Sequence, residues 1–144
     1  MEQFTNNFSY EELIASSTAD KLGLDNTPNA VEKEKLRKLA VEILQPIRDA
    51  LGKPIKVNSA FRSEKVNKAV GGVPSSQHRL GEAADLTLGS KENGKLYNMI
   101  RDMVNKGKIT LGQCIWEYGD NKNPLWVHVS LPTAKHKNEF FRIK

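Results

Sequence analysis

The chain has 144 residues, of which 38% are hydrophobic and 27% are charged, an ordinary balance for one globular domain. No apolar run approaches the ~20 residues of a membrane-spanning helix, so membrane insertion is not expected. The net charge is +5, but the basic residues alternate with acids, as over residues 32–35, and form no basic run. We therefore expect no nucleic-acid partner. Separately, we expect the protein to be a monomer.

The first thirty residues predict a short helix followed by a loop. Ser9 and Glu12 have the spacing of a capping box, in which each side chain satisfies a backbone N–H at a helix start. Residues 18–30 contain Gly23, Pro28 and several Asp and Asn residues, which are typical of a loop. The chain begins with neither the basic region nor the apolar core of a secretion signal, so we expect synthesis in the cytoplasm.

A long amphipathic helix is predicted from about residue 29 to residue 50, because apolar residues recur there at spacings of three to five. Pro46 should kink it or start its final turn, and Gly52 should end it. Shorter helices are expected over 63–70 and 91–106, and strands over 54–59, 83–88, 111–118, 125–131 and 139–143. The strands gather toward the end of the chain, which favours an α+β fold. We expect a small, mostly antiparallel sheet with helices packed on one side.

Two polar residues interrupt otherwise apolar strands. Asp85 lies in the strand over 83–88 and His128 in the strand over 125–131, while His78 stands seven residues before Asp85. Burying an unpaired charge costs several kcal/mol, and a metal ion is one way to neutralise it. Two imidazoles and one carboxylate, with a fourth position left to water, form the ligand set of a catalytic zinc site. Taken singly, each residue also has a structural explanation: a surface or helix-capping His78, a turn-forming Asp85 and a hydrogen-bonded core His128.

The segment Ser76-x-His78-x-x-Gly81-x-Ala83-x-Asp85 resembles the zinc-binding signature of the zinc D-alanyl-D-alanine carboxypeptidase family. Relatives of that family include D-alanyl-D-alanine dipeptidases, phage L-alanyl-D-glutamate endolysins and the hedgehog signalling fold. Two further segments, 59–63 and 126–130, resemble the arginine motif and the second metal motif of the family. The length of the chain predicts one domain over 1–144, with an N-terminal helix and loop over 1–30 and a core over 31–144, and the resemblance implies a hedgehog-like fold for this core. The resemblance also implies one Zn²⁺ per chain, held by His78, Asp85 and His128.

The family places a glutamate shortly before its last metal-binding histidine, in some members three residues before it. Leu125 occupies that position here, which is a departure. Glu117 is the nearest candidate for the general base, because a hairpin of strands 111–118 and 125–131 would place it beside His128. Such a base would take a proton from the zinc-bound water, whose pKa the metal lowers to about 7.

Four other residues are expected at the substrate. Arg62 is a fixed cation able to hold a carboxylate or an oxyanion. Ser76 and Gln77 are predicted to bind substrate or to orient the site. Trp126 stands where some members of the family have a histidine, and we expect it to line the groove. His136 lies in a charged segment and is expected to be solvated.

The resemblance implies a zinc peptidase that hydrolyses peptide bonds in bacterial peptidoglycan stem peptides, as a D-Ala-D-Ala carboxypeptidase or as an endopeptidase of endolysin type. Its partners would be peptidoglycan peptides, reached after phage-type or lysis-type release or from within a virion. The departures at Leu125 and Trp126 leave a second hypothesis open, a binding module that retains zinc and has lost catalysis. The remaining hypothesis is a basic structural or nucleic-acid-associated protein, which a metal assay would exclude.

Overall fold

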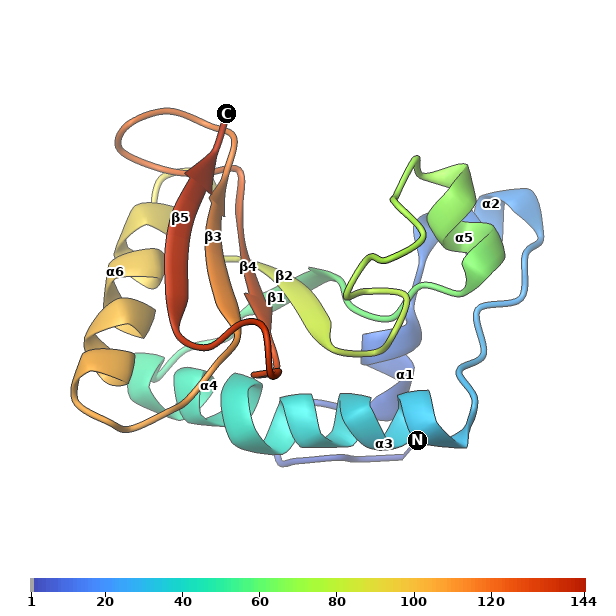
Figure 1. Ribbon diagram of the computed structural model, residues 1–144, viewed down its shortest axis with the longest axis horizontal. Coiled ribbons are helices and arrows are strands. Elements are labelled where there is room, and N and C mark those ends of the chain that lie inside the picture. The colour runs from blue at the N-terminus through green and yellow to red at the C-terminus, as the bar shows by residue number, and fades with distance from the viewer. Residues whose placement is uncertain (1) are drawn as a thin grey trace.

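A computed structural model describes residues 2–144 (Figure 1). Its helical segments are α1 (Tyr10–Ile14), α2 (Ser17–Leu22), α3 (Ala30–Leu39), the π-helical η1 (Ala40–Leu44), α4 (Gln45–Leu51), α5 (Glu64–Ala69) and α6 (Asn93–Asn105). Its strands are β1 (Lys56–Ser59), β2 (Ala83–Thr87), β3 (Gln113–Glu117), β4 (Trp126–Ser130) and β5 (Glu139–Ile143). The predicted α+β class is confirmed.

The five strands form one sheet in the order β1-β2-β4-β3-β5. Three of the pairings are antiparallel, and only β3 and β5 run parallel. The predicted hairpin of the third and fourth strands is therefore confirmed as β3 and β4. The central position of β4 matters for function, because it places β2 on one side of this strand and β3 on the other.

Alternation along the strands separates a core face from a polar face. Val127 and Val129 of β4 are fully buried, as is Leu86 of β2, and all three belong to the hydrophobic core. Successive side chains of a strand point to opposite faces. Asp85 and His128, which are register partners, therefore share the face away from this core. In Figure 1, α6 lies along one side of the sheet and the α3–α4 helix runs beneath it.

The long predicted helix is present, but a π-helical segment interrupts it. The N–H of Gln45 bonds to the carbonyl of Ala40, five residues earlier, and Pro46 follows in the first turn of α4. Proline has no N–H, and its ring clashes with the carbonyl four residues before it, so a wider turn accommodates it. Gly52 ends the helix in the left-handed conformation with φ 73°, as expected.

The loop predicted over 18–30 was wrong in its first part, where α2 forms. The Ser16 hydroxyl accepts the Ala19 N–H at its start, and Gly23 ends it with φ 66°. Only Ala19 of this helix is buried, so no apolar period marks it in the sequence. Phe4, Phe8 and Leu13, which precede α2, belong to the main hydrophobic core. None of the helices over residues 2–144 has both the length and the hydrophobicity needed to cross a bilayer.

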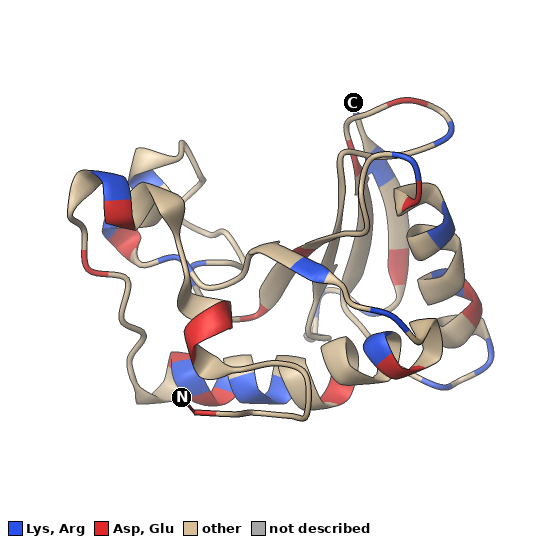
Figure 2. Ribbon diagram, turned by 180° about the vertical axis from the view of Figure 1, so that it is seen from behind, with Lys and Arg blue, Asp and Glu red and all other residues tan. Residues whose placement is uncertain are grey.

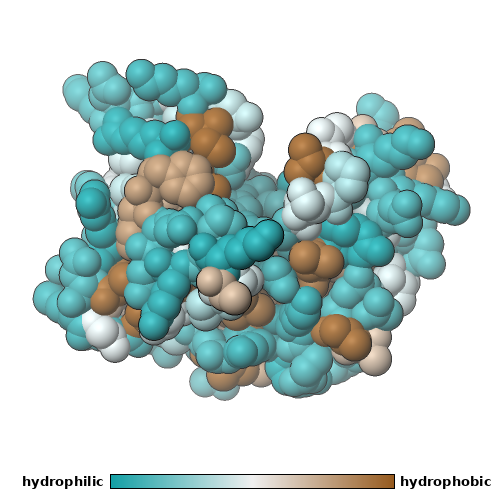
Figure 3. Space-filling model, viewed as in Figure 1, coloured by the Kyte–Doolittle hydropathy of each residue, from teal (hydrophilic) through white to brown (hydrophobic). Residues whose placement is uncertain are grey.

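The molecule has two parts with a hollow between them. The sheet and α6 form one part, and the segment containing α2 and α5 forms the other, with the α3–α4 helix below both (Figure 1). The space-filling view shows the hollow, with hydrophobic atoms on both of its walls (Figure 3). Basic and acidic residues alternate along the long helix (Figure 2), as over residues 32–35 of the sequence.

Candidate metal centre and substrate cleft

Three potential metal ligands converge on the polar face of the sheet. His78 Nε2 lies 3.2 Å from Asp85 Oδ1, and His128 Nδ1 lies 3.1 Å from the same oxygen. All three residues are buried, and their ligand atoms lie within 4.8 Å of one another. Ligands of a tetrahedral zinc ion, with bonds of about 2.0–2.1 Å, stand about 3.3 Å apart. The spacing therefore fits a single metal ion, and it brings together the three residues predicted as ligands.

The outer nitrogen of each imidazole has a carbonyl partner. His78 Nδ1 lies 2.7 Å from the backbone oxygen of Ala60, and His128 Nε2 lies 2.8 Å from the side-chain oxygen of Gln77. A carbonyl only accepts, so these two nitrogens carry the protons, and the inner nitrogens present lone pairs. Two lone pairs and a carboxylate then face one another, an arrangement that needs a cation. Carbonyl partners of this kind are typical of metal-binding histidines.

The electrostatics of Asp85 favour its charged form. Burial raises the pKa of the Asp85 carboxyl, but hydrogen bonds and positive charge from His128 and His78, when these imidazoles are protonated, outweigh burial and hold that pKa well below its usual range. Arg62 places a permanent cation beside the same carboxylate, with Nη2 3.8 Å from Asp85 Oδ2. Asp85 is therefore available as an anionic ligand wherever the protein is folded near neutral pH.

His78 is held in place by the turn-rich segment between α5 and β2. Its carbonyl accepts the Arg62 N–H at 3.0 Å, and its N–H donates to the Ser76 hydroxyl at 3.3 Å. Gly81 ends this segment with φ 76°, and a side chain there would meet the backbone of α3 at Glu32. Ion pairs from Arg79 to Glu32 and from Lys35 to Glu82 fasten the same segment to α3. The metal-binding motif thus rests on the long helix.

Glu117 lies beside the three ligands, as the hairpin prediction required. One of its carboxylate oxygens is 3.6 Å from His128 Nδ1, the nitrogen that faces Asp85. Burial raises the pKa of Glu117, and the nearby charge of Asp85 adds to the effect. Leu125 is half exposed and has no carboxylate. Its backbone N–H donates to the backbone carbonyl of Glu117. The carboxylate next to the metal ligands therefore comes from the neighbouring strand.

Arg62 and Ser76 lie within reach of the same centre. The Arg62 guanidinium is oriented by Ser59 at 3.3 Å and by Asn67 at 3.4 Å. The Ser76 hydroxyl already accepts the His78 N–H, and Gln77 contacts His128, so both residues orient the histidines. Their additional roles toward substrate stay predictions, as does the role of Arg62.

A cleft of about 1130 Å³ contains the metal ligands. It follows β3 in both directions from His128, which pairs with Ile115: Gln113 lies at one end and Tyr118 at the other. Its walls also contain the predicted site residues Arg62, Ser76, Gln77, Glu117 and Trp126. Several exposed apolar side chains line it as well, namely Val70, Val73, Leu80 and Ile143. This volume exceeds the range of roughly 300–1,000 Å³ that is typical of small-ligand pockets, so the cleft has room for a peptide of several residues.

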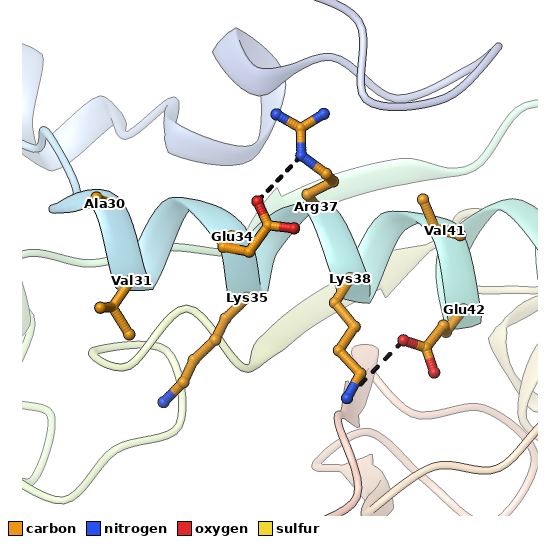
Figure 4. A pocket seen from close by; sticks show the side chains of 8 residues that line it. All are labelled: Ala30, Val31, Glu34, Lys35, Arg37, Lys38, Val41 and Glu42. Carbon is orange, nitrogen blue, oxygen red and sulfur yellow. Dashed lines mark hydrogen bonds and ion pairs between the residues drawn. The ribbon is translucent and has the colours of Figure 1, made fainter.

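A second hollow, of about 700 Å³, lies on the outer side of the long helix (Figure 4). All of its lining residues belong to this one helix. Its charged groups are paired along the helix surface, Arg37 with Glu34 and Lys38 with Glu42. Val31 and Val41 supply its apolar part and are exposed. Its lining residues include no histidine, and these acidic and basic side chains are already engaged in ion pairs. The hollow therefore has no group suited to catalysis or metal binding.

Sequence reasoning missed two contributors to the site. The Ala60 carbonyl that orients His78 carries no side-chain signal, so no sequence pattern reveals it. His136 keeps a partly solvent-exposed side chain, as expected, but it also lines the cleft, with Nδ1 2.8 Å from Glu139 and 3.3 Å from Gln113. Its position depends on β5 returning beside β3, a pairing that the sequence did not indicate.

Comparison with known proteins agrees with this geometry. A zinc D-Ala-D-Ala carboxypeptidase of Streptomyces albus G is 53% identical to the chain over 49 residues, which amount to 33% of this chain and 19% of that protein. The chain therefore matches about a fifth of the length of this relative. The family model of peptidase M15 matches residues 6–130, which include all three candidate metal ligands, Arg62 and Glu117. The predicted resemblance is confirmed: the chain belongs to the peptidase M15 family.

Proposed function

We propose that the protein is a zinc peptidase that hydrolyses peptide bonds in bacterial peptidoglycan stem peptides. The observation that carries this proposal is the Glu117 carboxylate 3.6 Å from His128 Nδ1, beside a set of three candidate ligands. Three protein ligands are the number found at catalytic zinc sites, where water takes the fourth position. A site that only stores metal has no need of an extra, partly buried carboxylate beside its ligands. The zinc D-Ala-D-Ala carboxypeptidase of Streptomyces albus G supports both the metal and the class of substrate.

Each residue of the proposed site has its own task. His78, Asp85 and His128 would hold Zn²⁺, which when bound acidifies water and polarises a carbonyl group. Glu117 accepts the proton from the attacking water and returns it to the leaving amine.

Arg62 has the character of an anion-binding residue. Its guanidinium lies near the ligand set and is fixed by Ser59 and Asn67. We propose that it holds a substrate carboxylate or the oxyanion of the tetrahedral intermediate. Stem peptides carry several carboxylates, which suits this role.

The direction of the cleft favours cleavage within a peptide over removal of a terminal residue. Space continues along β3 on both sides of His128, toward Gln113 and toward Tyr118. A substrate chain can therefore occupy both sides of the scissile bond. We accordingly propose an endopeptidase of endolysin type, which acts on the cell wall after phage-type or lysis-type release or from a virion.

The test is digestion of purified peptidoglycan by the zinc-loaded protein, with mass spectrometry of the soluble products. In the second part of the test, the protein is incubated with defined stem peptides that have either a free or an amidated C-terminus. An endopeptidase cleaves both forms at one internal bond, whereas a carboxypeptidase releases a terminal residue from the free form alone. No cleavage of any wall peptide by the zinc-loaded protein would contradict the proposal and favour a zinc-retaining binding module.

A further inference from the structure

The indole N–H of Trp126 is buried without a hydrogen-bond partner. Among the residues that the structure describes, it is the sole buried side-chain nitrogen or oxygen in this state. Leaving a buried donor unpaired costs free energy, and such a group in a native fold needs an explanation. Its location offers one, because Trp126 lines the same cleft as the candidate metal ligands.

Trp126 stands directly across the hairpin from Glu117. The two residues are register partners of β4 and β3, so their side chains lie on the same face. Side chains of directly opposite residues in an antiparallel pair start about 5 Å apart and interact. The Trp126 ring is held by Tyr118, with ring centroids 5.5 Å apart and planes at 67°. The indole is thus fixed next to the candidate general base.

The surroundings of Glu117 contain few groups that orient its carboxylate. One oxygen lies 3.6 Å from His128 Nδ1, a nitrogen whose lone pair faces the metal position. Burial raises the pKa of Glu117 most strongly, and the Trp126 indole is among the groups that oppose this rise, as a hydrogen-bond donor does. The Trp126 indole N–H, which lacks a hydrogen-bond partner, therefore lies next to the Glu117 carboxylate, which few groups orient.

We propose that Trp126 is a positioning residue for Glu117. Its indole N–H donates a hydrogen bond to the Glu117 carboxylate during turnover and holds this base toward the attacking water. The inference rests on the proposed peptidase function and adds a role to a residue expected only to line the groove. It also gives a physical reason for an indole at this place, since the apolar ring alone contributes no donor.

The test is the Trp126→Phe variant, which keeps an aromatic ring against Tyr118 and removes the N–H. We expect kcat on a stem peptide to fall by about 10- to 100-fold, the usual cost of losing a hydrogen bond to a charged group, while KM and zinc occupancy stay unchanged. Trp116→Phe is the matched control. It removes another indole N–H, which donates to the Asp120 carbonyl at 3.1 Å on the opposite face of β3. This control should lower the melting temperature and leave kcat unchanged.

A double-mutant cycle separates positioning of Glu117 from any direct effect on substrate. In a Glu117→Gln background, Trp126→Phe should change the single-turnover rate by less than about twofold, because the base that it positions is gone. A Trp126→His variant, which retains an N–H donor, should recover part of kcat. An equal loss in both backgrounds, or a normal kcat for Trp126→Phe in an active enzyme, would overturn the inference alone. An inactive wild-type protein would overturn the proposed function and the inference with it.

Discussion

At the scale of single residues, the hydrogen bonds behind the histidines decide which atoms face the metal position. The Ala60 carbonyl accepts a hydrogen bond from the Nδ1–H of His78, and the side-chain oxygen of Gln77 accepts one from the Nε2–H of His128. The two imidazoles therefore present different nitrogens to Asp85. The residue types of the ligand set could be predicted from their place in the sequence, but these orientations depend on contacts between segments far apart in the chain.

His78→Ala and His128→Ala should each abolish stoichiometric zinc binding, because either change leaves two ligands for the ion. The wild-type protein should contain about one zinc per chain by elemental analysis. His136→Ala is the matched control, since His136 lines the cleft and contacts Glu139 but no metal ligand. Full zinc occupancy in either ligand variant would remove that histidine from the site.

At the scale of elements, Gly81 connects the metal-binding segment to the long helix. Its φ of 76° favours glycine, and a Cβ at this position would lie 2.7 Å from the Glu32 carbonyl oxygen. Gly71 has a similar φ of 78° with nothing within 4 Å, so the pair separates backbone strain from steric contact. Both substitutions to alanine should cost stability through strain.

Gly81→Ala should lower the free energy of unfolding by about 1–3 kcal/mol more than Gly71→Ala, because it adds a collision with rigid backbone. Urea titration of both variants and the wild type, all without metal, measures this difference. Equal losses for the two variants would show that the segment moves away from α3 at no cost. The tight contact would then have no part in holding His78.

The predictable elements were those with a local signal. Glu117 could be placed beside His128 because the turn residues 119–124 separate two apolar segments, 111–118 and 125–131, that were predicted as strands of a hairpin. The short α2 has a single buried residue and escaped notice. The parallel pairing of β5 with β3 is a long-range contact with no sequence period of its own, so the position of His136 in the cleft wall could not be foreseen.

At the scale of the whole molecule, the candidate ligands join two parts of the fold. His78 comes from the segment after α5, whereas Asp85 and His128 come from neighbouring strands of the sheet. A metal ion held by all three would fasten this segment to the sheet. Since a ligand that binds only the folded state stabilises it, zinc removal should weaken the entire domain.

Chelation should therefore lower the melting temperature, by an amount that corresponds to about 4 kcal/mol if free zinc stood at a thousand times its dissociation constant. Amide hydrogen exchange should speed up most over residues 70–82, which contain His78 and lie outside the helices and strands. Scanning calorimetry and exchange mass spectrometry of the zinc-loaded and the chelated protein check both points. An unchanged melting temperature on full zinc removal would contradict this role of the metal.

The central claim is that Glu117 acts as the base of a zinc peptidase, and single-turnover cleavage of a stem peptide at equal zinc occupancy tests it most directly. Glu117→Gln keeps the shape of the side chain but cannot accept a proton. The variant should bind zinc and substrate as the wild type does, and its rate should fall by roughly 10²–10⁴-fold. Equal rates for the two proteins would contradict the claim and move the search for the base to Glu82, another acid lining the cleft.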